Sequence, residues 1–208
     1  MGTKKGLIFG SAPVGRWEFL KPLSHWADVV IAADGGLDAA RLAGFSPTVY
    51  IGDGDSGGRA EAGLTCVTLP AEKDLTDLEA AYRWARDHGC GDLILTGCTG
   101  GRLDHSMAAL GLLETAGREG VHAAVLDERN RIEFLLPGSC QIPDRGYRYF
   151  SLIPADSLLT GVSISGAKYD LSRRDVPRGG SLTVSNEFSR DSVQISFASG
   201  ACYLIYSN

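Results

Sequence analysis

LILTGCTGGRLDH, residues 93–105, joins a short apolar run to a glycine-rich loop and then to the start of a helical pattern. The apolar run at 93–96 predicts a buried strand, and the pattern at 104–119 predicts a helix. A strand that leads through a tight loop into a helix is the repeating unit of a parallel sheet. This stretch therefore predicts an α/β fold, with glycines where a ligand can approach the backbone closely.

The same alternation runs through the first 127 residues. Short apolar runs predict strands at 6–9, 29–33, 49–51, 65–68, 93–96 and 123–126. Helical patterns lie at 17–23, 37–43, 76–88 and 104–119. The third helix is the best marked, because Thr76 and Glu79 form a capping-box sequence and Gly89 supplies a stop. We predict that residues 1–127 form a mostly parallel sheet with flanking helices.

Residues 128–208 have a different pattern. Short runs rich in β-branched and aromatic residues predict strands at 132–136, 147–153, 161–164, 182–184, 193–197 and 202–206. Prolines and glycines separate these runs, and no long helical periodicity interrupts them. We predict an all-β sandwich domain, jelly-roll-like, at 128–208.

Composition narrows the class of protein. The chain has 208 residues, 44% hydrophobic and 22% charged, which is typical of a globular protein with an ample core. A net charge of −5 argues against broad nucleic-acid binding. Five cysteines without a C-x-x-C pair disfavour a zinc site or a disulfide framework and fit a reducing compartment. No apolar run approaches the ~18 residues of a membrane span, so we expect a cytoplasmic protein with no membrane partner.

Acidic residues gather in four loops of the first domain. The loops read ADGG at 33–36, GDGDS at 52–56, KDLTD at 73–77 and GGRLDH at 100–105. Three of them follow predicted strands, and the carboxyl ends of parallel strands meet at one edge of a sheet. Magnesium prefers carboxylate oxygens, and phosphates prefer backbone N–H groups and guanidinium. The loops together predict a site for magnesium and phosphate.

Two of these loops also have simple structural explanations. Asp53 and Asp55 can face one cation or two neighbouring ones, or they can each satisfy their own glycine turn. Asp74 and Asp77 flank a helix start, where acids favour the helix dipole without any catalytic role. Lys73, which precedes Asp74, can contact a phosphate.

The fourth loop is the strongest candidate for binding an anion. Gly100 and Gly101 permit close approach of the backbone, while Arg102 and a helix N-terminus attract phosphate. Asp104 can cap the helix, bind metal or act as a base, and His105 can donate to a phosphate or be structural. No Gly-Lys-Ser/Thr follows, so the loop is not a Walker A motif, and no convincing G-x-G-x-x-G is present.

The ordered set of motifs resembles the thiamine pyrophosphokinase (thiamine diphosphokinase) family. It comprises DGG, GDxDS, KDxTDxE, GGRxDH, GxKY and SNE, from residue 34 towards the C-terminus. The resemblance implies an ATP-binding catalytic domain at 1–127 and a thiamine-binding β-sandwich at 128–208. It implies transfer of a pyrophosphoryl group from ATP to the hydroxyethyl group of thiamine, giving thiamine diphosphate and AMP. It also implies a homodimer with active sites at the subunit interface.

The resemblance also implies roles for individual residues. Magnesium and the reacting groups would be surrounded by Asp53, Asp55, Asp77 and Asp104. ATP would be bound by Asp34, Gly35, Gly36, Lys73, Gly97, Thr99, Gly100, Gly101, Arg102 and His105. Thiamine would meet Asp77, Asp104, Ser185 and Asn186, with Phe188 as the candidate stacking aromatic. Catalysis would use Asp53, Asp55, Asp74, Asp77, Arg102 and Asp104, with the base left open among Asp74, Asp77 and Asp104.

Two other classes of function remain open on the sequence. A metal-dependent phosphohydrolase can use the same acids and Arg102 to activate water, and it would release phosphate without thiamine. A nucleotide- or metabolite-binding module would use the acids only as caps and turns. Such a module would turn over nothing.

Overall fold

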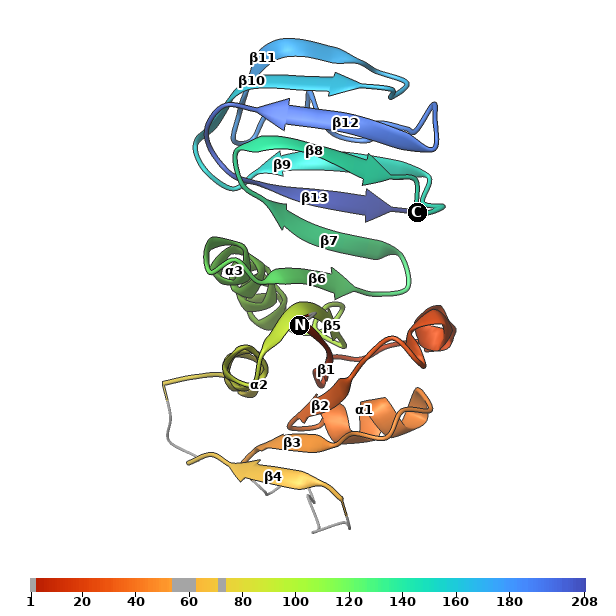
Figure 1. The fold of residues 1–208 in the computed structure, drawn as a ribbon, viewed down its shortest axis with the longest axis vertical. Coiled ribbons are helices and arrows are strands. Elements are labelled where there is room, and N and C mark those ends of the chain that lie inside the picture. Colours follow the sequence, from red (N-terminus) through yellow and green to blue (C-terminus); the bar gives the residue numbers. More distant parts are fainter. Residues whose placement is uncertain (1–2, 54–62, 71–73) are drawn as a thin grey trace. The chain divides into compact units, whose positions relative to one another are not determined.

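A computed structural model describes residues 3–53, 63–70 and 74–208 of the chain (Figure 1). The chain divides into two compact units, residues 1–128 and 129–208. Two predicted site residues, Asp55 and Lys73, lie outside the described residues. Across the described ranges, no helix is long and apolar enough to cross a membrane.

The first unit is built on a parallel sheet with the spatial order β4-β3-β2-β1-β5-β6. Its strands are β1 (Lys4–Phe9), β2 (Val29–Ala33), β3 (Val49–Gly52), β4 (Thr65–Thr68), β5 (Cys90–Thr96) and β6 (His122–Leu126). The chain adds β2 to β4 on one side of β1, and then β5 and β6 on the other. The strand order therefore reverses between β1 and β5, and the carboxyl ends of these two strands form a topological switch point.

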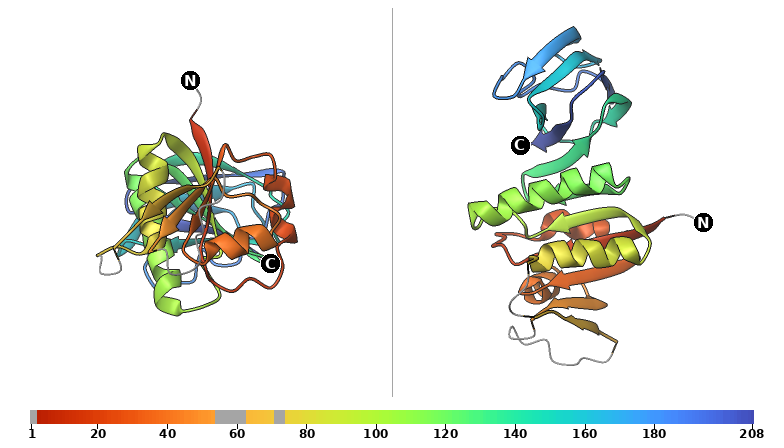
Figure 2. Two further views of the ribbon diagram at one scale, coloured as in Figure 1. Left: turned by 90° about the horizontal axis from the view of Figure 1, so that it is seen from below. Right: turned by 90° about the vertical axis from the view of Figure 1, so that its left-hand side faces the viewer.

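Helices cover both faces of this sheet (Figures 1 and 2). The helices α2 (Asp77–Asp87) and α3 (Leu103–Arg118) lie over one face. The helix α1 (Gly36–Leu42) and a 3-10 helix (Glu18–Leu23) lie over the other. Because both faces are covered, the central strands are apolar throughout rather than alternating, which explains why their sequence signal is strong.

The side chains of β1 show how the two faces are filled. Leu7 and Phe9 pack with Leu20 of the 3-10 helix and Ala40 of α1. Ile8 points to the opposite face because successive side chains of a strand alternate. Leu7, Ile8 and Phe9 are all fully buried, so this strand anchors both layers of helices beneath the switch point.

The predicted helices are confirmed with one change. Thr76 is the N-cap of α2, and its Oγ1 accepts a hydrogen bond from the Glu79 N–H at 3.1 Å. The segment predicted as a helix at 17–23 is a 3-10 helix with Pro22 inside it. Proline cannot donate a backbone hydrogen bond and its ring clashes with the preceding turn, which disfavours a longer regular helix here.

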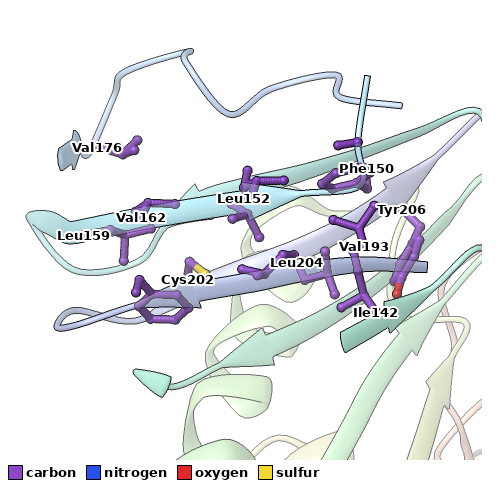
Figure 3. Close-up of a cluster of buried hydrophobic side chains, with 14 residues drawn as sticks. Ile142, Phe150, Leu152, Leu159, Val162, Val176, Val193, Cys202, Leu204 and Tyr206 are labelled. Carbon is purple, nitrogen blue, oxygen red and sulfur yellow. The ribbon is translucent and has the colours of Figure 1, made fainter. Parts of the chain in front are cut away.

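The second unit is a sandwich of two antiparallel sheets, which confirms the predicted fold class. One sheet has the order β7-β13-β9 and the other has the order β11-β10-β12-β8. The strands are β7 (Asn130–Leu135), β8 (Gly138–Pro143), β9 (Tyr149–Pro154), β10 (Leu158–Ser165), β11 (Leu171–Pro177), β12 (Ser192–Phe197) and β13 (Cys202–Ser207). Leu152 and Leu204 from the first sheet meet Val162 and Val193 from the second in one buried cluster (Figure 3).

The strand prediction for the second unit was wrong in three places. Residues 182–184 form a turn, in which Thr183 is buried and its Oγ1 donates to the Leu152 carbonyl at 2.6 Å. The strands β8 and β11 were not predicted, and both are edges of their sheet. Edge strands tolerate prolines and charged side chains. Pro143 and Pro177 are the last residues of β8 and β11, and in the sequence alone they indicate turns.

Candidate functional site

A pocket of about 540 Å³ lies at the carboxyl ends of β1, β2 and β5 in the first unit. Its described lining comes from the loops after these strands and from the N-terminal halves of α2 and α3. The lining residues are Gly10, Ser11, Ala12, Pro13, Ala33, Asp34, Thr76, Asp77, Leu78, Gly97, Cys98, Gly101, Arg102, His105 and Ala108. The pocket is thus at the switch point, where open α/β sheets bind ligands.

The loops after β1 and β5 touch through their backbones. The Gly10 N–H donates to the Thr96 carbonyl and the Ala12 N–H donates to the Gly97 carbonyl, both at 2.8 Å. A Cβ on Gly10 would lie 2.6 Å from the Gly97 oxygen. This contact leaves no room for side chains, so backbone atoms form the floor of the pocket.

Asp34 holds an unusual backbone conformation at the end of β2. Its φ is 48°, in the left-handed region that aspartate tolerates better than most residues. The Asp34 N–H donates to the Ile51 carbonyl at 2.9 Å, which fixes it beside the end of β3. Next to it, a Cβ on Gly36 would lie 2.0 Å from the Phe9 carbonyl oxygen. Gly36 of the DGG motif is therefore what allows α1 to start this close to β1.

Arg102 and Asp104 form a two-contact ion pair at the start of α3. The Arg102 Nη2 donates to Asp104 Oδ2 at 2.6 Å and the Nε donates to Oδ1 at 3.2 Å. This pairing, with a further hydrogen bond from the His105 N–H, holds the pKa of Asp104 below its usual range. Both side chains are exposed, and solvent screens such a pair. A phosphate or a cation can therefore compete for either partner.

Asp77 and Asp74 occupy different positions at the start of α2. Asp77 is the first residue of the helix, is half-buried and lines the pocket. Asp74 is exposed in the preceding turn and does not belong to the described lining. The helix-start explanation holds for Asp77, yet its position also presents a carboxylate to a ligand.

The cysteine in the glycine loop is a structural filler. Cys98 is buried, and its Sγ donates to the Thr96 carbonyl at 3.3 Å. Burial raises the pKa of the Cys98 thiol to about 12. The thiol therefore stays protonated and unreactive at neutral pH.

The described residues do not form a complete protein cage for a metal ion. Within residues 3–53, 63–70 and 74–208, no group of three or more His, Cys, Asp or Glu residues could hold a metal. Asp53 directly follows β3, and its pair Asp55 is outside those ranges. Magnesium bound with a nucleotide commonly uses only one or two protein carboxylates, with phosphate oxygens and waters completing the shell. The donor chemistry at this edge of the sheet fits such an ion.

In the second unit, the SNE motif is organised by Asn186. The buried Asn186 Oδ1 accepts hydrogen bonds from the N–H groups of Tyr169 and Glu187 at 3.0 and 2.9 Å. Its Nδ2 donates to the Tyr169 carbonyl at 2.8 Å. Ser185 is exposed with a φ of 58°, and its N–H donates to Ser151 Oγ at 2.9 Å. Asn186 therefore joins the GxKY and SNE motifs through its side chain.

Phe188 packs its ring partly into the core of the second unit. It is half-buried and packs on Phe150 and Tyr206, with ring centroids 4.9 and 6.2 Å away. The exposed aromatic side chain in this region is Tyr169. The contacts of its ring with the core of the second unit disfavour stacking of Phe188 on a ligand, which stays a prediction.

Some of the predicted site residues line the pocket and others do not. Those in the described lining are Asp34, Asp77, Gly97, Gly101, Arg102 and His105. Those described but outside the lining are Gly35, Gly36, Asp53, Asp74, Thr99, Gly100 and Asp104 in the first unit. The loop 10–13 was not predicted. Its only sequence signal is a glycine directly after an apolar run, followed by small residues.

Two family models match the chain. The model described as "Thiamin pyrophosphokinase, catalytic domain" matches residues 20–125. The model described as "Thiamin pyrophosphokinase, vitamin B1 binding domain" matches residues 139–202. The matches fall on the first and second units respectively.

Individual relatives agree with these models. The chain is 32% identical over 184 residues to a thiamine pyrophosphokinase of Bacillus subtilis, covering 85% of this chain and 86% of the relative. A crystal structure of the Bacillus subtilis thiamine pyrophosphokinase matches with a TM-score of 0.90 and 28% identity, covering 99% of each chain. One from Geobacillus thermodenitrificans matches with a TM-score of 0.86 and 30% identity, covering 98% of this chain and 97% of that one.

The fold, the pocket and these matches define a transferase of the kinase type, with an α/β unit and a β-sandwich unit. The chain belongs to the thiamin pyrophosphokinase family.

Proposed function

We propose that the pocket of the first unit binds ATP for the activity of this family. That activity is ATP-dependent transfer of a pyrophosphoryl group to the hydroxyethyl group of thiamine, which gives thiamine diphosphate and AMP. The observation that carries the assignment is the position of the pocket at the β1–β5 switch point, with Arg102 in its lining. The acceptor hydroxyl is neutral, so the chain must mainly position the reactants and balance the phosphate charge.

The start of α3 supplies the donors for phosphate. Gly100, Gly101 and the first turn of α3 offer backbone N–H groups, and Arg102 offers a planar guanidinium. His105 lines the same pocket and can donate to a phosphate oxygen. On the opposite wall, Asp34, Gly35 and Gly36 would face the nucleotide. Gly97 and Thr99 complete the predicted ATP-binding loop, and Lys73 is a further phosphate candidate.

Magnesium would be held with the triphosphate by Asp53, Asp55, Asp77 and Asp104. When bound, the ion neutralises charge on the phosphate oxygens and orients them for displacement. Asp104 suits an ionic role because its lowered pKa keeps the carboxylate charged. Asp53 and Asp77 stand at the carboxyl end of β3 and the first turn of α2, both on this edge of the sheet.

Asp77 is the favoured candidate to receive the hydroxyl proton of thiamine. A base needs to reach its proton, and Asp77 is a described lining residue of the pocket whereas Asp74 is not. Asp104 is the weaker candidate because the pairing with Arg102 lowers its pKa and therefore its basicity.

Thiamine recognition is assigned to the second unit together with Asp77 and Asp104. Ser185 is exposed and precedes Asn186 in the chain, and the Asn186 side chain holds the backbone of Tyr169 through two hydrogen bonds. We assign Asn186 to shaping this surface. The acids attract the cationic thiazolium ring.

A homodimer with active sites at the subunit interface completes the proposal. It is supported by Leu103 and Met107, exposed apolar residues one turn apart on α3 beside Arg102. A cytoplasmic location is supported by five free cysteines, of which Cys66 is exposed.

The test is to incubate the purified protein with ATP, magnesium and thiamine and to separate the products by chromatography. Formation of thiamine diphosphate and thiamine-dependent AMP supports the proposal. Release of phosphate without thiamine would instead identify a phosphohydrolase. Absence of any turnover under varied metal conditions would leave only a binding module.

A further inference from the structure

Thr99 was predicted to bind ATP, yet its hydroxyl has a partner within the protein. The Thr99 Oγ1 donates to Asp127 Oδ2 at 2.8 Å. Asp127 directly follows β6, and the hydrogen bond is partly buried. The described lining of the pocket includes Gly97 and Gly101 but not Thr99. The side chain of Thr99 therefore turns towards β6.

This hydrogen bond is one of two anchors of the glycine loop. The first anchor is the backbone contact between Gly97 and the loop after β1, at 2.8 Å. The second is the contact between Thr99 and Asp127. Beyond Thr99 only Gly100 and Gly101 precede Arg102, and Gly100 has a φ of 86°. Glycines add no side-chain anchor, so Thr99 is the nearest residue on the loop side of Arg102 whose side chain is anchored outside the loop.

The start of α3 has no side-chain cap of its own. Arg102 occupies the N-cap position, and its side chain makes no capping hydrogen bond. An N-cap side chain ordinarily fixes the direction in which a helix begins. Here the loop before the helix shares that task with Asp104, whose Oδ1 accepts the His105 N–H in the first turn. A charged acceptor suits this task, because hydrogen bonds to ionised groups are shorter and stronger than neutral ones.

We infer that Asp127 is a positioning residue for ATP: by accepting the Thr99 hydroxyl it holds the loop 97–101 and Arg102 in the geometry that binds phosphate. The inference rests on the proposed function of the pocket. Asp127 itself touches no reacting group in this scheme. Its effect reaches the nucleotide through Thr99 and the two glycines.

The test compares Asp127→Ala with a matched control, Asp92→Ala. Asp92 also joins β5 to β6, through its Oδ1 at 2.9 Å from His122 Nδ1, but Asp92 and His122 lie in the N-terminal halves of these strands. Asp127→Ala removes a side-chain contact between the segments that follow β5 and β6, and Asp92→Ala removes one between the two strands themselves. Only Asp127→Ala is expected to weaken the binding of ATP. Both the KM for ATP and the Kd measured by calorimetry should rise about tenfold, and the KM for thiamine should stay unchanged.

Further variants separate positioning from stability. Asp127→Asn retains an acceptor for Thr99 and is expected to recover most of the ATP affinity. Thr99→Val is expected to match Asp127→Ala, and the double variant to be no weaker than either single one, because they remove the same contact. If Asp127→Ala fails to fold, Thr99→Val still tests the inference, because it removes the same hydrogen bond from the other partner.

Measuring ATP binding by calorimetry distinguishes failure of the inference about Asp127 from failure of the proposed function. An unchanged ATP affinity in Asp127→Ala or Thr99→Val, or additive losses in the double variant, overturns the inference while wild-type turnover still supports the function. Wild-type protein that forms no thiamine diphosphate overturns the function itself. An equal loss of ATP affinity in Asp92→Ala would assign the effect to strand pairing and so overturn the inference.

Discussion

Gly10 and Gly97 face each other so closely that neither position can carry a side chain. A Cβ on Gly10 would lie 2.6 Å from the Gly97 carbonyl oxygen, and a Cβ on Gly97 would lie 2.6 Å from the Gly10 oxygen. The two residues follow adjacent parallel strands, β1 and β5, on either side of the switch in strand order. The floor of the pocket is therefore bare backbone.

Gly10→Ala and Gly97→Ala are each expected to destabilise the protein by about 1–3 kcal/mol, the usual effect of overpacking. Gly97→Ala should be the more severe, because its φ of 64° also disfavours a side chain. Denaturant unfolding measures both changes. The matched control is Gly111→Ala in α3, where no atom lies within 4 Å of the added Cβ. It should stabilise the helix by up to about 1 kcal/mol.

Equal stability of Gly10→Ala and wild type would show that the two loops separate without cost. In that case the floor of the pocket would not be rigid. Gly111→Ala should keep its small gain in stability whatever the result for Gly10→Ala.

The first unit could be predicted closely from the sequence because its central strands are buried on both faces. The run at 29–33 matches β2 residue for residue, and the runs at 6–9 and 93–96 end where β1 and β5 end. In the second unit, edge strands carry the charged residues and prolines that ordinarily mark turns. Arg173 and Arg174 in β11 are exposed, so no hydrophobic alternation marks that strand.

The candidate site was predictable where residues have distinctive chemistry and not where they are small. Arg102 and Asp77 stood out because guanidinium and carboxylate groups suit phosphate and magnesium. Ser11 and Pro13 line the same pocket, but nothing local marks them. Their position follows from the parallel pairing of β1 with β5, a contact between segments about 87 residues apart that only the sheet topology reveals.

Arg102→Lys is expected to reduce kcat by about a hundredfold, the usual scale for loss of a donor to a charged transition state. Lysine keeps the positive charge but lacks the planar fork that contacts two oxygens. Steady-state kinetics and the far-ultraviolet circular dichroism of the variant measure the effect. The exposed position of Arg102 predicts a retained fold. Full activity would exclude Arg102 from phosphate binding.

Asp53→Ala and Asp104→Ala are expected to abolish turnover while the fold survives. Asp53 follows a strand end, and Asp104 is exposed in the first turn of α3, so neither is part of the core. Product formation and thermal unfolding should be measured together on each variant. Loss of folding in both variants would favour a purely structural role for these acids.

Asn186→Ala is expected to destabilise the second unit by about 1–3 kcal/mol, because the backbone groups that it satisfies become partly unpaired. The same variant should raise the KM for thiamine more than the KM for ATP. Asn186→Asp is the informative comparison, since it keeps the acceptor and loses the donor to Tyr169. A change confined to ATP would contradict the role given to this residue.

Thiol labelling should distinguish the exposed cysteine from the buried ones. Burial raises the pKa of Cys98 and of Cys202 to about 12, so both should react slowly with a disulfide reagent at pH 8. Cys66 is exposed and should react fast. A Cys66→Ser variant should lose the fast phase, and unfolding should release the remaining thiols. Fast labelling of Cys98 in the native protein would show that the loop after β5 opens.

The contact between α2 and α3 should make stability depend on pH in the acid range. The Tyr82 hydroxyl donates to Glu119 Oε2 at 2.6 Å, and Arg86 Nη1 lies 2.9 Å from the same oxygen. The hydrogen bond from Tyr82, followed by that from Arg86, lowers the pKa of Glu119. A lowered pKa in the folded state stabilises the fold above the ordinary glutamate pKa of about 4.3. This stabilisation is lost as the pH falls through the folded-state value.

Glu119→Gln should therefore be less stable than wild type at pH 7, and the difference should shrink as the pH is lowered below about 4. Glutamine can still accept from Tyr82, so the variant isolates the contribution of charge. Glu79→Gln serves as the control, because the ion pair that it removes, with Arg83, lies within α2. Denaturant unfolding across this pH range measures both. A wild-type advantage that stays constant down to pH 3 would mean that the charge of Glu119 does not stabilise the contact between α2 and α3.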